Sequence, residues 1–421
     1  FIGSTLLWTL LFHRQTLGIE RVYIIARRKG SLSAASRIRR MLQEPMFCFL
    51  REEEKSRLVI VCEGDATLPW VGLCESDLTA MRTDSSVSHV INCAAYVNFN
   101  LSLRDAARFN ISSALELKKL AEDFQHQVTF LHVSTAFVHG SECGSSECPL
   151  DENLFSLGIF DPEALFESMK GLPFYASKAM TELGFKNTYT FSKCVAEHLL
   201  CKSSKTRTII LRPSIIGPSI QEPFRGWAGK SPSTIVAAPC LFFSFPYVLW
   251  AFGRHCVPCL PVDIFCSQTV SLLSSSMDQN KACATSKKVS VINVAWNSVR
   301  SSDKSPDQMF TWTQYVIATA QTGAIVGLTS RFVSYMGIFV SMKLFPALKI
   351  GEYQFKWLHR LVSNATSMIL RWQGETQENL DRMRPILNLP VFFYHYMNND
   401  FVFQSNLIIP TNFDAEEYMM V

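Results

Sequence analysis

Short apolar runs alternate with helix-compatible segments over the first 300 residues. The runs are nearly continuous in Val, Ile and Leu, a pattern typical of strands that are covered on both faces. Helices are expected between them, over Ser4–Thr16, Asp105–Asp123 and roughly Asn187–Cys201. The predicted strands are Arg21–Ala26, Leu58–Cys62, His89–Cys93, Val128–Val133, Thr206–Leu211 and Lys288–Val294. This alternation predicts an α/β fold, a doubly wound parallel sheet of the Rossmann type, with ligands at the carboxyl ends of its strands.

The pattern changes after about residue 305. Strand-like runs thin out, and helix-compatible stretches such as Tyr335–Leu344 and Phe355–Leu370 replace them. We therefore predict a nucleotide-binding domain over residues 1–305 and a smaller, mostly helical C-terminal domain over residues 306–421.

Residues 231–253 contain no charged side chain. The segment is long enough to cross a bilayer, but the prolines at positions 232, 239 and 246 oppose a continuous spanning helix. Two interpretations stay open. Either the segment contacts or spans a membrane, or it is a buried or tunnel-lining segment.

Composition excludes two classes of protein. Of 421 residues, 48% are hydrophobic and only 18% are charged, which excludes an intrinsically disordered chain. The net charge of +4 is too small and too scattered to indicate a nucleic-acid partner. The 13 cysteines are interpreted as mostly reduced thiols. Cys256 and Cys259 form a lone C-x2-C pair with no second pair nearby, so no metal centre is predicted.

Tyr189 and Lys193 form the strongest local signal for chemistry. A spacing of four places the phenol and the ammonium one turn apart on one helix face. A nearby positive charge favours the phenolate and lowers the tyrosine pKa, which suits a proton donor to a carbonyl that is being reduced by hydride. The same spacing also arises by chance on amphipathic helices, so the pair needs support from its surroundings.

Other polar or small residues follow the predicted strands. Ser134 and Thr135 come directly after Val128–Val133, where their hydroxyls can hydrogen-bond a substrate carbonyl or simply cap a turn. Small residues after His89–Cys93, Ala94 among them, allow a flat cofactor to approach the backbone. The basic pair that follows Arg21–Ala26 suits a ribose 2′-phosphate, and so NADP rather than NAD, or else forms an ordinary basic loop. That pair is Arg27 and Arg28.

These residues together resemble a known family. Phe1-Ile-Gly3 is similar to the end of a glycine loop, and Tyr189, Lys193, Ser134 and Thr135 resemble the catalytic set of extended short-chain dehydrogenases/reductases. Within that group the chain resembles the alcohol-forming fatty acyl-CoA reductases of the male-sterility type. The supporting stretches are EGD (63–65), INCAAYVNFN (91–100), HVSTAFVHG (132–140), NTYTFSK (187–193), LRPSIIGPS (211–219) and EPFRGW (222–227). The resemblance covers residues 1–300 well and residues 306–421 loosely.

The resemblance implies roles for particular residues. Tyr189 would be the proton donor, Lys193 would hold the nicotinamide ribose, and Thr135, with Ser134 as the neighbouring candidate, would supply the catalytic hydroxyl. Cofactor contacts are implied for Gly3, Asp65, Ala94, Asn110, Lys193 and Pro213, in addition to Arg27 and Arg28. The family's first strand and most of its glycine loop have no counterpart here, so we expect the chain to be an N-terminally truncated fragment.

The expected activity is NADPH-dependent reduction of long-chain fatty acyl-CoA to fatty alcohol through an aldehyde. We also expect membrane association through residues 231–253, on the cytosolic side of the endoplasmic reticulum or peroxisome. Two alternatives stay open. One is another extended reductase or isomerase that acts on a sterol or a nucleotide sugar. The other is a non-catalytic, membrane-associated binding protein that has lost cofactor binding.

Overall fold

The computed structural model describes residues 1–202, 205–229, 255–282, 289–296, 298–299, 311–312, 352–372, 376–378, 395–405 and 407. Residues 231–253, the charge-free segment, lie outside this part of the chain, as does the helix expected at Tyr335–Leu344. Within the described residues no helix is both long enough and apolar enough to span a membrane.

All the predicted strands are present, each within two residues of its expected limits. They are β1 (Val22–Ala26), β2 (Val59–Glu63), β3 (His89–Asn92), β4 (Thr129–Val133), β5 (Arg207–Pro213) and β8 (Val289–Val294). β1 pairs with β2, and the other strands form a sheet in the order β3-β4-β5-β8, with every pair parallel. Two short parallel pairs join β6 (Ile215–Gly217) to β7 (Cys259–Pro261) and β9 (Ser298–Val299) to β10 (Phe403–Gln404). The α/β prediction is therefore confirmed.

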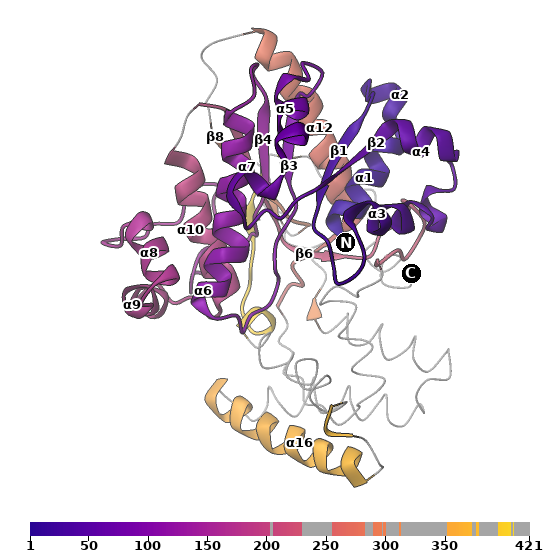
Figure 1. Ribbon diagram of the computed structural model, residues 1–421. Helices are drawn as coiled ribbons and strands as arrows, with labels where there is room; N and C mark the ends of the chain where they lie inside the picture. Colours follow the sequence, from indigo (N-terminus) through magenta and orange to yellow (C-terminus); the bar gives the residue numbers. More distant parts are fainter. Residues whose placement is uncertain are drawn as a thin grey trace.

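Helices cover both faces of the sheet (Figure 1). On one face Leu131 of β4 packs in a buried cluster with Leu6 of α1 and Phe265 of α12. On the other face Phe130 packs with Leu117 of α7. Because successive strand residues point to opposite faces, both sides of β4 must be apolar, as its sequence predicts.

Helices lie between the successive predicted strands, as the alternating sequence pattern indicates. They are α1 (Ile2–Phe12), α2 (Arg14–Leu17), α3 (Ala34–Leu42), α4 (Glu52–Leu58), α5 (Glu75–Thr83), α6 (Leu103–Ala106), α7 (Ser113–Glu122), α8 (Pro162–Lys170), α9 (Phe174–Glu182), α10 (Thr188–Lys202), α12 (Val262–Ala282) and α16 (Glu352–Trp372). Two of the predicted helices are interrupted. Ser4–Thr16 is divided between α1 and α2, and a π-helical turn at Ala107–Ser112 separates α6 from α7.

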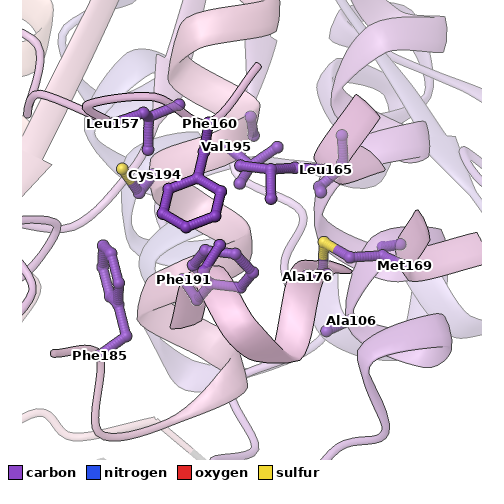
Figure 2. Close-up of a cluster of buried hydrophobic side chains, with 14 of the residues drawn as sticks. Ala106, Leu157, Phe160, Leu165, Met169, Ala176, Phe185, Phe191, Cys194 and Val195 are labelled. Carbon is purple, nitrogen blue, oxygen red and sulfur yellow. The ribbon is translucent and has the colours of Figure 1, made fainter. Parts of the chain in front are cut away.

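Helix α10 is anchored by an apolar cluster (Figure 2). Phe191 is fully buried, and its ring lies 5.2 Å from that of Phe185 in an edge-to-face arrangement. Leu165 and Met169 of α8 pack in the same cluster. Burying a phenylalanine is worth roughly 1.5–3 kcal/mol, so the cluster holds α10 firmly. The helix begins with an N-cap, because Oδ1 of Asn187 accepts a hydrogen bond from the Thr190 amide at 2.8 Å.

Residues 395–405 pack against loops of the first 305 residues. The Leu150 amide donates to the Val402 carbonyl at 2.8 Å, and the Val402 amide donates to the Gly144 carbonyl at 3.1 Å. Most of residues 306–421 lies outside the described part, so the predicted domain boundary at residue 305 stays a prediction. The described residues do show that a segment near the C-terminus is built into the α/β part.

Candidate active site

The carboxyl ends of β3, β4 and β5 bring the predicted catalytic hydroxyls into place. The Ser134 amide donates to the Leu211 carbonyl at 2.7 Å, so the chain stays tied to β5 beyond the end of β4. Ser134 and Thr135 are both buried. Thr135 Oγ1 accepts a hydrogen bond of 3.4 Å from the Phe137 amide, whereas Ser134 Oγ has no partner among the described residues.

Helix α10 delivers Tyr189 and Lys193 to the same edge. The Lys193 side chain is completely buried, and its Nζ donates to the Val133 carbonyl oxygen at 2.8 Å. The same Nζ lies 3.5 Å from Nε2 of His132. The ring of Tyr189 lies 6.1 Å from that of Phe99, in the loop after β3. The structure thus brings the tyrosine–lysine pair to the strand ends that carry Ser134 and Thr135.

The electrostatics differ from the sequence expectation that Lys193 lowers the Tyr189 pKa. Burial lowers the pKa of Lys193 to about 8, with Glu197 and Cys93 opposing the shift. Burial also raises the pKa of Tyr189, and Tyr396 raises it further. The reason is that the lysine amine is desolvated and directed towards the end of β4, so desolvation dominates at both groups.

Asn110 holds two parts of the site together. It lies in the π-helical turn between α6 and α7, a kind of insertion that is frequent at functional sites. Its Oδ1 accepts from the Tyr96 amide at 2.9 Å, and its Nδ2 donates to Ser192 Oγ at 3.0 Å. The predicted residue therefore links the loop after β3 to helix α10.

Ala94 follows the end of β3, and Gly3 lies beside Cys93, the residue before it. The Ala94 amide donates to Oδ1 of Asn92 at 3.0 Å, which forms a tight turn with an exposed alanine. A β-carbon placed on Gly3 would lie 3.7 Å from Cβ of Cys93, an ordinary contact. Pro213, the last residue of β5, is buried at the same sheet edge.

The second group of predicted cofactor residues follows β1 and β2. Arg28 is paired with Glu63 at 3.0 Å, so an acidic residue does lie beside the basic pair. Sequence reasoning missed it because Glu63 ends the neighbouring strand. Asp65 accepts hydrogen bonds from the amide and hydroxyl of Thr67, both at 2.9 Å. Burial acts to raise the Asp65 pKa, but these hydrogen bonds and the Arg27 charge outweigh it and lower that pKa.

Two further residues of the site were not predicted from the sequence. His132, one residue before the end of β4, is fully buried and touches Lys193. The feature of the sequence that could have identified His132 is a polar residue inside an otherwise apolar strand. Tyr396 is also buried, and its hydroxyl accepts from Asn187 Nδ2 at 3.1 Å, close to Tyr189. Nothing in the local sequence predicts this contact, because Asn187 and Tyr396 are 209 positions apart.

No group of three His, Cys, Asp or Glu residues that could hold a metal ion is found in the described part of the chain.

Comparison with known proteins then identifies the family. The family model for the male sterility protein matches residues 1–269. The chain belongs to the male sterility protein family.

Relatives of this chain include proteins named as reductases. It is 31% identical over 233 residues to the mouse protein named fatty acyl-CoA reductase 1, with 54% of this chain and 43% of the relative covered. It is 28% identical over 233 residues to the Drosophila melanogaster protein named fatty acyl-CoA reductase wat, again with 54% and 43% covered. The aligned region is thus less than half the length of these curated relatives.

Solved structures support the fold of this chain. The reductase domain of a nonribosomal peptide synthetase from Mycobacterium tuberculosis superposes with a TM-score of 0.54 at 14% identity, covering 98% of this chain and 81% of that one. The terminal reductase domain of the myxalamid pathway superposes with a TM-score of 0.53 at 17% identity, covering 80% and 74%. At these identities the likeness concerns the fold alone.

Proposed function

We propose that this chain carries the catalytic domain of an NADPH-dependent reductase that converts long-chain fatty acyl-CoA to fatty alcohol through an aldehyde. The observation that carries the proposal is the convergence of Tyr189, Lys193, Ser134 and Thr135 at one sheet edge. That convergence occurs in a male sterility family chain whose curated relatives are named fatty acyl-CoA reductases.

The residues at the edge fit a nicotinamide nucleotide. Ser134 Oγ is buried without a described partner, and the turn at Ala94 presents backbone with only a methyl side chain. Lys193 would hold the nicotinamide ribose, with Ala94, Asn110, Pro213 and Gly3 around it. A bound nicotinamide would supply the hydride.

The basic pair after β1 favours NADPH in this proposal. Arg28 is already paired with Glu63, which leaves Arg27 as the guanidinium for a ribose 2′-phosphate. Asp65 lies at the end of β2, where it would face the adenine. The pairing of Arg28 is the reason to assign the 2′-phosphate contact to Arg27.

The chain's own groups would act on the carbonyl oxygen of the substrate. Thr135 and Tyr189 would donate hydrogen bonds to that oxygen as negative charge develops on it, which lowers the barrier to thioester reduction. Collapse of the resulting hemithioacetal would release the CoA thiol and leave an aldehyde. In the second reduction, for which a second NADPH would supply the hydride, Tyr189 would give its proton to the alkoxide, and Lys193 as an ammonium would favour the phenolate left behind.

The acyl chain needs apolar shelter, because each buried methylene contributes roughly 0.8 kcal/mol to binding. We propose that residues 231–253 provide it or bring the protein to a membrane that holds the substrate. The proposed location is the cytosolic side of the endoplasmic reticulum or peroxisome. Deleting this segment should reduce membrane association in flotation assays.

Product analysis by gas chromatography tests the function. The full-length protein, given palmitoyl-CoA and NADPH, should form hexadecanol, and Tyr189→Phe should abolish it while NADPH still binds. Tyr175→Phe is the matched control, because the Tyr175 hydroxyl, on α9, accepts a hydrogen bond of 3.3 Å from the exposed Asp161 amide at the start of α8. Hexadecanol from Tyr189→Phe at an undiminished rate would refute the assignment of the proton donor. Failure to form aldehyde or alcohol despite NADPH binding would refute the substrate.

A further inference from the structure

A buried chain of hydrogen-bonding groups joins the turn after β3 to the lysine of helix α10. It runs from Asn92 through His132 to Lys193, and all three side chains are at most 1% exposed. Asn92 and His132 are register partners on the parallel strands β3 and β4. Their closest side-chain atoms, Nδ2 of Asn92 and Nδ1 of His132, are 3.1 Å apart.

The turn fixes the orientation of the Asn92 amide. Its Oδ1 accepts the Ala94 backbone N–H at 3.0 Å, and a backbone amide can only donate. The NH2 group of Asn92 is therefore the end that faces His132. Because that group donates, Nδ1 of His132 must accept, and the ring proton must lie on Nε2.

The ring N–H then faces the lysine. Nε2 of His132 lies 3.5 Å from Nζ of Lys193, which also donates to the Val133 carbonyl at 2.8 Å. An imidazole N–H opposes an ammonium at this place, whereas a neutral amine can accept from the ring with its lone pair and still donate to Val133. The geometry thus disfavours the charged form of Lys193.

The other ionisable groups around this amine do not reverse that effect. Burial raises the pKa of the Cys93 thiol to about 12, so the thiol is uncharged. Burial likewise raises the pKa of Tyr189. Glu197, one turn further along α10, acts in favour of the ammonium but is bound to Arg212 at 2.6 Å. Burial lowers the pKa of Lys193 to about 8 in spite of Glu197.

We propose that His132 is a positioning residue, fixed by Asn92 as the Nε2–H tautomer, that disfavours the ammonium form of Lys193, so that at pH 9 the free protein holds an uncharged amine at the end of β4. The proposal rests on the proposed function in one respect. If Lys193 binds the nicotinamide ribose and assists Tyr189 as an ammonium, binding of the nucleotide must be accompanied by uptake of a proton at Lys193.

Calorimetry measures that proton directly. NADPH is titrated into the full-length protein at pH 9 in buffers that differ in protonation enthalpy. The wild-type protein should take up between about half a proton and one proton per nucleotide bound. Asn92→Asp should take up almost none. Its carboxylate would accept from both the Ala94 amide and His132, which moves the ring proton to Nδ1. Nε2 of His132 would then be an acceptor for Lys193, which would stay an ammonium with or without nucleotide.

Asn98→Asp is the matched control. Asn98 makes the same local turn, with Oδ1 accepting from the Asn100 amide at 3.0 Å, but it is exposed and has no histidine contact among the described residues. It should take up the same fraction of a proton as the wild-type protein. Equal uptake by Asn92→Asp and Asn98→Asp, or none by the wild-type protein, would overturn the proposal.

A second measurement needs neither nucleotide nor substrate. Long-range ¹H–¹⁵N spectra of the wild-type protein labelled with ¹⁵N-histidine should show His132 as a neutral Nε2–H ring, with its signals assigned by their loss in His132→Gln. A proton on Nδ1, or an imidazolium, would overturn the proposal even if Asn92→Asp does not fold. Absence of NADPH binding would instead refute the proposed cofactor, and the histidine spectra would still decide the role of His132.

Discussion

The ion pair between Glu197 and Arg212 gives the sharpest prediction about stability. Both side chains are at most 1% exposed, and three contacts of 2.6–3.2 Å join them. Arg212 lies on β5 next to Pro213, and Glu197 lies on α10 one turn beyond Lys193. The pair therefore ties α10, the helix that carries Tyr189, to the carboxyl end of β5. Changing Glu197 to Gln leaves the Arg212 charge buried without its counterion.

Removing one partner of a buried ion pair costs about 3–5 kcal/mol, since the remaining charge keeps its desolvation penalty. With an m-value of about 3 kcal/mol per molar urea, the midpoint of unfolding should fall by roughly 1–1.7 M. Equilibrium urea unfolding followed by circular dichroism measures this shift. The control is Glu167→Gln, which removes an exposed pair with Lys170 and should cost at most about 1 kcal/mol. A loss below about 1 kcal/mol for Glu197→Gln would refute the reasoning.

Two further predictions concern Lys193 and a glycine near the site. Folding lowers the pKa of Lys193 from 10.5 to about 8, so between these pH values the unfolded chain binds more protons than the folded chain. The free energy of unfolding should therefore rise with pH through that window, by up to about 3 kcal/mol. Lys193→Met should remove that rise in urea unfolding at pH 8 and pH 10, and an unchanged pH dependence would contradict the assignment. Gly140 has a φ of +61°, and a β-carbon there would press on the Leu183 carbonyl oxygen. Gly140→Ala should therefore lower the free energy of unfolding by at least about 3 kcal/mol, measured by thermal or urea unfolding. The control is Gly158→Ala, which has a φ of +57° and open space around it and should cost about 1–2 kcal/mol. Equal costs for the two variants would show that the contact with the Leu183 carbonyl is relieved.

The strands could be predicted from the sequence because each buried parallel strand forms a short, nearly continuous run of apolar, often β-branched residues bounded by polar segments. The breaks inside predicted helices could not. Ser4–Thr16 is divided near His13, and the segment at Asp105–Asp123 contains a π-helical turn. Neither segment contains a Gly or Pro that would mark the break. The π-helical turn contains Asn110, whose contacts with Tyr96 and Ser192 lie outside its own helix.

The sequence by itself determined the fold class and much of the candidate site. Tyr189 and Lys193 are one helical turn apart, and Ser134 and Thr135 end a strand, so local geometry predicts where these groups lie. Only the tertiary structure decided what surrounds them. It places His132 beside Lys193, Glu63 beside Arg28 and Tyr396 beside Asn187, each from a different segment of the chain. It also reversed the expected direction of the Tyr189 pKa, because that direction depends on burial, and burial is a property of the whole packed chain rather than of any spacing within it.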